Sequence, residues 1–507
     1  MHYVSHSWLN ENVIEKRDYQ EQIVNTALSG NTLVVLPTGL GKTSVAALVA
    51  AETLRRKPEG KILFMAPTRP LVNQHKKNFE RFFKLGIEFA AVTGHDDPED
   101  RVKLYNNAQV IFSTPQTIRN DLKVGKIDLS QFSLLIFDEA HRAVGNYAYP
   151  YIAKVYSYHN GLMLALTASP GSQRQKIDEI KKRLYIDKIE IRDRADEDVA
   201  PYVQEMNQLW LEVELTKPLQ SIKEYLENCK NQRITKLLKW KIIHYPNVSK
   251  SQLLRLQEEL AKKKSGFSWA VMSMLAEVLK ADHALTLLET QCLHSLKIYF
   301  DSLVEQRAKK SVARLLNDEN FKNAMRLTSE LLNEGQEHPK IEKLKEIITG
   351  ELAKNKFSSI IVFAQYRDTI AKINDELKVV KNAAPIEFIG QTKKKGKGLS
   401  QKEQIQILNE FKMGFYNVLI ASQIGEEGLD ITETDTVIFY EPVPSAVRRV
   451  QRMGRTARTK AGKIIMLMTK DTRDEAYHWS GFQKEKRMKD ILYKMQKGQR
   501  SVTEFRA

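Results

Sequence analysis

One segment of the sequence restricts the possible folds of this chain more than any other. Residues 36–43 read LPTGLGKT; they follow a short apolar run, residues 32–36, and precede an apolar segment with helical spacing, residues 44–54. A buried strand, a glycine-rich turn and a helix in this order form a phosphate-binding loop, in which backbone amides at the helix N-terminus hold an anion. The segment therefore predicts an α/β domain with a nucleoside triphosphate site.

Each residue of this segment has its own predicted role in binding the nucleotide phosphates. Gly39 and Gly41 let the backbone approach the phosphates, Lys42 would reach the β and γ phosphates, and the Thr43 hydroxyl would bind Mg²⁺. Leu36 departs from the general pattern, which has glycine at this position. The predicted nucleotide contacts in the loop are Pro37, Thr38, Gly39, Leu40, Gly41, Lys42 and Thr43.

Two adjacent acids end a second apolar run. Asp138 and Glu139 follow residues 133–137 and begin the segment DEAH. A carboxylate at the end of a buried strand is costly without a partner, and a bound Mg²⁺ would supply one. We expect Asp138 to hold the metal and Glu139 to polarise the attacking water, so that ATP and Mg²⁺ are the cofactors. Solvated acids at a strand end are the alternative.

A third segment, QRMGRTAR at residues 451–458, carries regularly spaced basic side chains. Arginines three residues apart fall on one helical face, but Gly454 interrupts this helix. Arginine fingers stabilise the charge that develops on a transferring phosphoryl group. We therefore expect catalytic roles for Lys42, Glu139, Gln451, Arg455 and Arg458; a basic helix that binds a phosphate backbone is the alternative interpretation.

The distribution of apolar runs and helical patterns along the chain predicts three domains and a C-terminal helix. Short apolar runs alternate with helical patterns up to residue 205 and again over residues 339–475, which is typical of parallel α/β sheets. The strands predicted in the first of these parts are residues 32–36, 61–66, 110–113, 133–137 and 162–166. Between them, residues 206–338 are rich in Leu, Lys, Glu and Gln at helical spacing. We predict an α/β fold with two parallel-sheet lobes, 1–205 and 339–475, an all-helical insert at 206–338, and a C-terminal helix and tail at 476–507.

The composition indicates the class of binding partner and the cellular compartment. Lys and Arg total 79 against 62 Asp and Glu, which gives a formal net charge of +17 and favours a polyanionic partner. Two distant cysteines, Cys229 and Cys292, argue against a disulfide framework or a zinc site. We expect an intracellular, cytoplasmic protein without a signal peptide, a membrane span or a membrane partner.

The ordered motifs resemble those of superfamily 2 helicases of the DEAH-box type, whose two lobes are RecA-like. The resemblance covers roughly residues 15–470 outside the helical insert. Its further motifs are RDYQ at 17–20, APTRP at 66–70, TG at 93–94, STPQT at 113–117, LTASP at 166–170, IVFAQYR at 361–367 and SQIGEEGLD at 422–430. It implies that Arg17 and Gln20 contact adenine and that Gly428 and Asp430 contact the nucleotide. It also implies that His141, Thr167 and Ser169 couple the ATP state to movement of the lobes.

The resemblance also implies a track for nucleic acid across both lobes. A motor must ignore sequence, so its contacts should go mostly to the phosphate backbone. The expected track residues are Thr68, Arg69, Thr93, Gly94 and Thr114 in the first lobe, and Arg367, Gly390, Gln391 and Ser422 in the second. For each hydroxyl, a helix cap or a turn is the alternative role.

Finer features are similar to archaeal Hef and to its relative, the Fanconi anaemia M protein. They are GQ at 390–391, GLSQKEQ at 398–404 and YEPVPS at 440–445. This resemblance implies a DNA helicase or translocase that acts on forked or branched DNA as a monomer, with a thumb-like insert. The ERKxxxD nuclease motif of some Hef proteins is missing, so we expect a separate nuclease, or a truncated chain, and possible cooperation with a sliding clamp.

Two other interpretations stay open at this point. Dicer and the innate immune RNA sensors share much of the motif set, so a double-stranded RNA translocase is the main alternative. A non-catalytic scaffold with a helicase fold is the second; the complete set of catalytic residues argues against it. The insert is either a branch-recognition domain or a spacer that braces the lobes.

Overall fold

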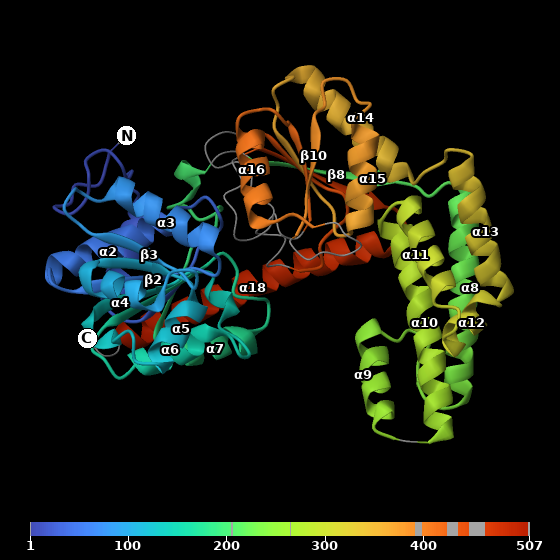
Figure 1. Cartoon of the computed structure of the whole chain (residues 1–507), viewed down its shortest axis with the longest axis horizontal. Coiled ribbons are helices and arrows are strands. Elements are labelled where there is room, and N and C mark those ends of the chain that lie inside the picture. Colours follow the sequence, from blue (N-terminus) through green and yellow to red (C-terminus); the bar gives the residue numbers. More distant parts are fainter. Residues whose placement is uncertain are drawn as a thin grey trace.

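The computed structural model describes residues 2–203, 206–263, 265–390, 398–422, 434–445 and 462–504. Two lobes, each built on a parallel sheet, lie side by side, and an elongated helical domain stands on the far side of the second lobe (Figure 1). The predicted α/β architecture, with two parallel-sheet lobes and a helical insert, is confirmed. Among the helices of the described residues, none combines the length and the apolarity that a membrane crossing requires.

The first lobe contains a seven-stranded parallel sheet in the order β3-β4-β2-β5-β6-β1-β7. Its strands are β1 (Thr32–Val35), β2 (Lys61–Met65), β3 (Phe89–Val92), β4 (Val110–Ser113), β5 (Phe132–Phe137), β6 (Leu162–Thr167) and β7 (Lys188–Ile191). Alternate strand residues enter opposite cores: Leu33 and Val35 face one layer of helices, whereas Val34 faces the other. Burial on both faces explains why these strands appear in the sequence as continuous apolar runs.

Helices cover both faces of this sheet. They are α1 (Asp18–Leu28), α2 (Lys42–Arg56), α3 (Arg69–Phe82), α4 (Pro98–Asn107), α5 (Pro115–Lys123), α6 (Ala148–Tyr156) and α7 (Arg174–Arg183). Helices α1, α2 and α3 pack in one core, and α5, α6 and α7 pack in the other. Three of these helices, α3, α4 and α5, have a proline in their first turn, where the missing N–H costs no intrahelical hydrogen bond.

The second lobe contains a six-stranded parallel sheet in the order β10-β11-β9-β12-β13-β8. Its strands are β8 (Met206–Val213), β9 (Ile360–Phe363), β10 (Pro385–Phe388), β11 (Val418–Ala421), β12 (Thr436–Phe439) and β13 (Gly462–Thr469). Its helices include α14 (Pro339–Lys354), α15 (Arg367–Leu377) and α16 (Gln401–Lys412). This sheet also separates two apolar cores, one beneath α14 and α15 and one beneath α16.

The start of the second lobe differs from the prediction. We placed residues 206–338 in the helical insert, but Met206–Val213 forms β8 and pairs with all eight residues of β13 in parallel register. Trp210 and Leu211 contact opposite cores of the sheet, and Leu209 is exposed. An edge strand with this mixed exposure lacks the continuous apolar run by which the central strands were recognised.

The insert is a helical bundle with two apolar cores. Its helices are α8 (Lys217–Lys239), α9 (Lys250–Ala261), α10 (Gly266–Thr290), α11 (Leu293–Glu305), α12 (Lys310–Leu316) and α13 (Glu319–Asn333). One core joins α8 and α10 to α11, α12 and α13; the other lies between α8, α9 and α10. Both cysteines are buried free thiols, and burial raises the pKa of Cys229 to about 12 and that of Cys292 to about 11.

A long terminal helix, α18 (Arg473–Glu504), joins all three parts of the molecule (Figure 1). At its start, Arg473 pairs with Asp282 and Glu289 of α10 in the insert. The next residue, Asp474, forms a fully buried ion pair with Lys340 of α14. Further along the helix, Met488 and Leu492 enter a core of the first lobe. The sequence predicted this helix, but it did not predict its return to the first lobe.

Candidate functional site

The phosphate-binding loop connects β1 to α2 and depends on two glycines in the left-handed region. Gly39 has φ +90° and Gly41 has φ +80°. The conformation of Gly41 favours glycine, and a Cβ atom there would lie 2.4 Å from Nε2 of Gln20, so a larger residue would displace the Gln20 amide. Leu36 stands where the general motif has glycine, and its side chain is fully buried in the core beneath α1 and α2. The departure from the motif is therefore used for packing.

Lys42 and Gln20 are both held against the loop. Lys42 Nζ donates to the carbonyl oxygen of Leu36 at 2.9 Å. Gln20 Nε2 and the hydroxyl of Tyr19 donate to the carbonyl oxygen of Leu40 at 3.2 and 2.9 Å. The other amide atom, Gln20 Oε1, is buried without a hydrogen-bond partner among the described atoms. A buried acceptor beside a glycine cradle fits a nucleotide base with an exocyclic amine. Tyr19 is a contact that we did not assign from the sequence.

Arg17, the other predicted adenine contact, lies at the N-terminal end of α1. Its guanidinium donates to Oε2 of Glu15 at 3.0 and 2.7 Å and lies 5.2 Å from the ring centroid of Tyr202. Burial lowers the pKa of Arg17, but hydrogen bonds to Tyr19 and Glu15 outweigh it and leave the pKa raised. Arg17 is thus a fixed positive charge next to Gln20.

Asp138 follows β5 directly and is almost completely buried. Its Oδ2 lies 3.0 Å from Nε2 of His75, a residue of α3. Burial would raise the pKa of Asp138, but the hydrogen bond from His75 and the charges of His75 and Lys42 outweigh it and lower the pKa. Asp138 is therefore a carboxylate, and a buried carboxylate fits a divalent cation.

Glu139 has a strained backbone and begins a chain of polar contacts. Its φ is +50°, which is uncommon for a residue with a side chain. Its Oε2 lies 3.2 Å from Nδ1 of His141, and the same Nδ1 lies 3.2 Å from the hydroxyl of Thr167. That hydroxyl accepts the backbone N–H of Ser169, whose own hydroxyl donates to Sδ of Met488 in α18. The structure brings the three predicted coupling residues together.

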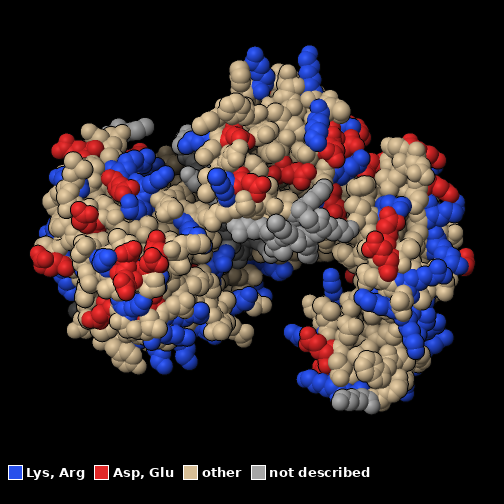
Figure 2. Space-filling view, in the orientation of Figure 1, with Lys and Arg blue, Asp and Glu red and all other residues tan. Residues whose placement is uncertain are grey.

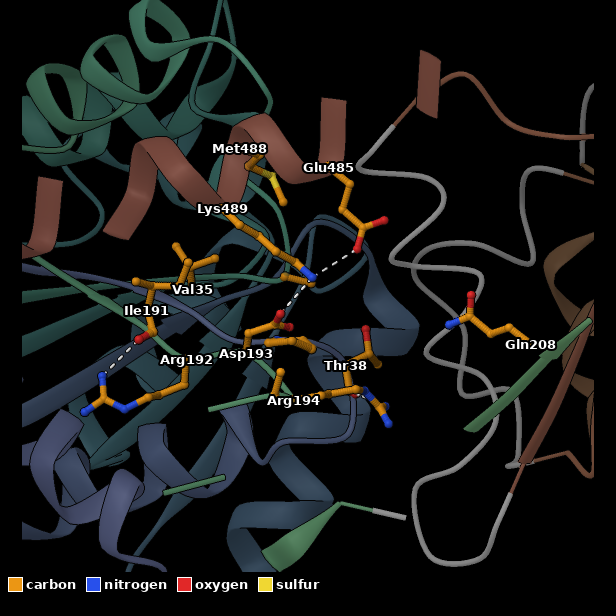
Figure 3. A pocket seen from close by; sticks show the side chains of 13 residues that line it. Val35, Thr38, Ile191, Arg192, Asp193, Arg194, Gln208, Glu485, Met488 and Lys489 are labelled. Atoms are coloured by element: carbon orange, nitrogen blue, oxygen red, sulfur yellow. Dashed lines mark hydrogen bonds and ion pairs between the residues drawn. The ribbon is translucent and has the colours of Figure 1, made fainter. Parts of the chain in front are cut away.

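A cavity of about 230 Å³ adjoins the phosphate-binding loop (Figure 3). The loop contributes Pro37 and Thr38, α18 contributes Glu485, Met488 and Lys489, and β8 of the second lobe contributes Gln208. In Figure 3, Lys489 reaches toward Asp193, at 2.7 Å, and toward Glu485, at 3.3 Å. Residues of the first lobe, the second lobe and α18 therefore meet beside the loop. No pattern in the sequence indicated this cavity, because the residues that line it are distant from one another in the chain.

The predicted track residues of the first lobe lie at one edge of the sheet. Thr68 and Thr114 are the N-cap residues of α3 and α5, and Arg69 is the first residue of α3. The backbone N–H and hydroxyl of Thr93 both donate to Oδ2 of Asp96, and Gly94 follows directly. These residues follow β2, β3 and β4, which are neighbours in the sheet.

The same edge carries the nucleotide site on the adjacent strands. The phosphate-binding loop follows β1, Asp138 follows β5 and Thr167 ends β6, and these three strands are also neighbours. Carboxyl ends of parallel strands form the usual ligand edge of an open α/β sheet. One half of this edge therefore carries the candidate nucleotide site and the other half carries the candidate track.

The second lobe brings together three of its predicted track residues. Arg367 Nη2 donates to the carbonyl oxygen of Gly390 at 3.0 Å. The backbone N–H of Ser422 donates to the carbonyl oxygen of Phe388 at 3.0 Å. The remaining predictions for this lobe, Gln391, Gly428, Asp430, Gln451, Arg455 and Arg458, lie outside the described residues.

Three family models match the chain. They are "DEAD/DEAH box helicase" at residues 17–177, "Putative ATP-dependent RNA helicase, helical bundle" at 218–334, and "Helicase conserved C-terminal domain" at 339–460. The crystal structure of the Pyrococcus furiosus Hef helicase domain is 43% identical, with a TM-score of 0.73; the match covers 93% of this chain and 99% of that one.

Curated relatives extend the comparison. A putative ATP-dependent RNA helicase of Methanocaldococcus jannaschii is 38% identical over 97% of this chain and 63% of that protein. The ATP-dependent DNA helicase fml1 of Schizosaccharomyces pombe is 35% identical over 91% of this chain and 58% of that protein. The Fanconi anemia group M protein homolog of Mus musculus is 31% identical over 98% of this chain and 26% of that protein.

This chain therefore spans less than two thirds of the length of each of these curated relatives. The Hef helicase domain, in contrast, is matched over almost its whole length. The chain thus belongs to the Hef and Fanconi anaemia group M family of superfamily 2 DEAD/DEAH-box helicases, a family of nucleic-acid-dependent ATPases.

Proposed function

We propose that this protein is an ATP-dependent DNA helicase or translocase that acts on branched DNA. The observation that carries the proposal is the division of one sheet edge, where β1, β5 and β6 present the nucleotide site and β2, β3 and β4 present hydroxyls and an arginine. Because both halves belong to one packed sheet, a change at the nucleotide can reach the track through a rigid body.

The residues of the first lobe suit the hydrolysis of ATP. The backbone amides after Gly39 and Gly41, together with Lys42, bind the phosphates. Thr43 and Asp138 would hold Mg²⁺, which supplies charge neutralisation on the phosphate oxygens when it is bound. Glu139 orients the attacking water and accepts its proton, and His141 holds the Glu139 carboxylate in place.

Closure of the lobes completes the site in this proposal. Gln451, Arg455 and Arg458 belong to the second lobe and would stabilise the charge on the γ phosphate. The contacts from His141 through Thr167 and Ser169 support a route for coupling, because they connect Glu139 to α18. Helix α18 also contacts the second lobe and the insert. Movement of the lobes would therefore shift α18 and change its contact with Ser169.

The distal end of the insert supports a role in recognising branches. Trp240, Tyr245, Phe267 and Trp269 are all exposed there, and the rings of Trp240 and Phe267 lie 5.9 Å apart. Exposed lysines lie near them in the sequence, at positions 239, 241, 262 and 263. Figure 2 shows an uncharged area at this end of the insert, bordered by basic side chains and, on one side, by acidic ones. Aromatic rings stack on unpaired bases and lysines attract the backbone, a combination suited to a junction where bases leave the duplex.

The ATPase rate with different nucleic acids tests the proposal. It would be measured without nucleic acid, and with single-stranded DNA, duplex DNA, forked or four-way DNA, and duplex RNA. Glu139→Gln serves as the blank. We expect the largest stimulation with forked or four-way DNA. Stimulation of the ATPase rate by duplex RNA alone would show that the protein is a double-stranded RNA translocase instead. If no nucleic acid stimulates the rate even at low salt, the protein is a non-catalytic scaffold.

The same proposal includes an expected oligomeric state, cellular location and set of partner proteins. We expect the chain to act as a monomer on DNA, in the cytoplasm of a prokaryotic cell, with a nuclease or a sliding clamp supplied as separate proteins. Sedimentation of the protein with and without forked DNA measures the first expectation. A dimer on DNA would contradict it.

A further inference from the structure

A buried histidine contacts the acid that we assign to Mg²⁺. His75 lies two turns into α3, and only 8% of its surface is exposed. Its Nε2 lies 3.0 Å from Oδ2 of Asp138, and its ring packs on Phe64 with a centroid distance of 4.4 Å. A carboxylate only accepts hydrogen bonds, so Nε2 carries the proton and donates it. The other ring nitrogen, Nδ1, is buried without a hydrogen-bond partner among the described atoms.

The same helix begins at the candidate track. Thr68 is the N-cap of α3 and Arg69 is its first residue. His75 follows Arg69 by six positions, which places it about 9 Å further along the helix axis. Val72 and Phe79, on either side of His75 in the chain, are fully buried against the sheet. Helix α3 therefore connects the half of the sheet edge that carries the track with the acid of the nucleotide half.

We propose that His75 is a positioning residue that sets the place of the Asp138 carboxylate and links it to nucleic acid held at the start of α3. This proposal rests on the proposed function for the assignment of Asp138 to Mg²⁺ and for the nucleic-acid track at the start of α3. A small shift of α3 on contact with a phosphate backbone would move Nε2, and Oδ2 of Asp138 would follow the hydrogen bond. Partners of this kind orient ligands of a metal and tune its binding.

His75 could instead serve only to pack α3 against the sheet. Two amide variants distinguish this packing role from the positioning of Asp138. In glutamine the amide nitrogen is as many bonds from Cα as Nε2 is in histidine, so His75→Gln can keep the hydrogen bond to Asp138. In asparagine the amide nitrogen takes the place of Nδ1, so His75→Asn cannot reach Asp138. Both variants place an amide in the same apolar surroundings beside Phe64. Only the bond to Asp138 distinguishes them.

The experiment measures the Mg²⁺ dependence of nucleotide binding rather than ATPase activity. Binding of a fluorescent ADP analogue to the full chain is titrated with Mg²⁺, with and without forked DNA, for the wild type and both variants. Glu80→Gln, a change of an exposed residue on α3, is the matched control. Thermal unfolding of each variant is recorded in parallel.

We expect His75→Asn to raise the Mg²⁺ concentration at half-saturation about tenfold, and His75→Gln to stay close to the wild type. Forked DNA should lower this concentration for the wild type but not for His75→Asn. Equal shifts in the two amide variants would overturn the positioning role. A DNA effect that is equal in wild type and His75→Asn would overturn the link. If DNA has no effect on the wild type in binding or in ATPase rate, the proposed function fails, and the comparison without DNA still decides the role of His75.

Discussion

Replacing Gly41 by alanine tests the architecture of the phosphate-binding loop. Two costs follow from the structure. The backbone at φ +80° disfavours a residue with a side chain by about 1–2 kcal/mol. The new Cβ would also lie 2.4 Å from Gln20 Nε2 and displace it from the carbonyl oxygen of Leu40. Losing that hydrogen bond costs about 0.5–1.5 kcal/mol.

Together these costs amount to about 1.5–3.5 kcal/mol against the loop conformation that holds the phosphates. If the bound conformation carries the whole penalty, nucleotide affinity falls about 10- to 400-fold. Titration of a fluorescent ATP analogue measures this loss directly. We expect the thermal unfolding temperature to fall by only a few degrees, because the strain is confined to one loop.

Gly125→Ala is the matched control for Gly41→Ala. Gly125 has φ +69°, and a Cβ added there has no atom within 4 Å. It carries the backbone cost without the collision, in the turn after α5. Its nucleotide affinity should equal that of the wild type. Wild-type affinity in Gly41→Ala, or an equal loss in Gly125→Ala, would refute the reasoning about Gln20.

Three further predictions follow. Burial and the charge of Lys340 lower the pKa of His338 to about 3 from its ordinary 6.5. Below pH 6.5 the unfolded chain binds this proton and the folded chain does not, so the stability from this group is complete above that pH and falls by about 2 kcal/mol at pH 5. His338→Asn keeps a hydrogen-bond acceptor at the N-cap of α14 and should remove this pH dependence of stability, measured by hydrogen exchange of the α14 amides. The same pH dependence in the variant and the wild type would contradict the prediction. Lys340→Met leaves Asp474 buried without its counter-charge and should cost about 3–5 kcal/mol in urea unfolding, most of which the added change Asp474→Leu restores. Trp269→Ala should weaken binding of forked DNA, measured by fluorescence anisotropy, by about 1–3 kcal/mol; an equal loss for intact duplex would argue against stacking.

The sequence located most of the candidate nucleotide site because its signals are local. The phosphate-binding loop requires a strand, two glycines and a helix within one short segment, and the fold has them as predicted, with Gly39 and Gly41 left-handed. The resemblance to superfamily 2 helicases also implied a shared coupling role for His141, Thr167 and Ser169, which lie in contact in the structure. Parallel strands buried on both faces are continuous apolar runs, so β1, β2, β4, β5 and β6 were recognised.

Contacts between distant segments were not predictable in the same way. Strand β8 joins the second sheet at an edge, where one face is partly exposed and the apolar pattern is weak. The edge strands β3 (FAAV) and β7 (KIEI) were missed for a similar reason. His75 has no sequence signal either, because a histidine in an amphipathic helix gives no indication of the carboxylate that it will meet.

The chemistry of the loop, the two parallel sheets and the helical character of the insert could all be inferred from the amino-acid sequence. Each of these depends on periodicity or on conformational limits within a few residues. Three arrangements became visible only in the folded chain: α18 returns to the first lobe, β8 completes the second sheet, and α3 places His75 against Asp138. These arrangements depend on which surfaces remain to be buried once the local elements have formed, and that depends on the whole chain.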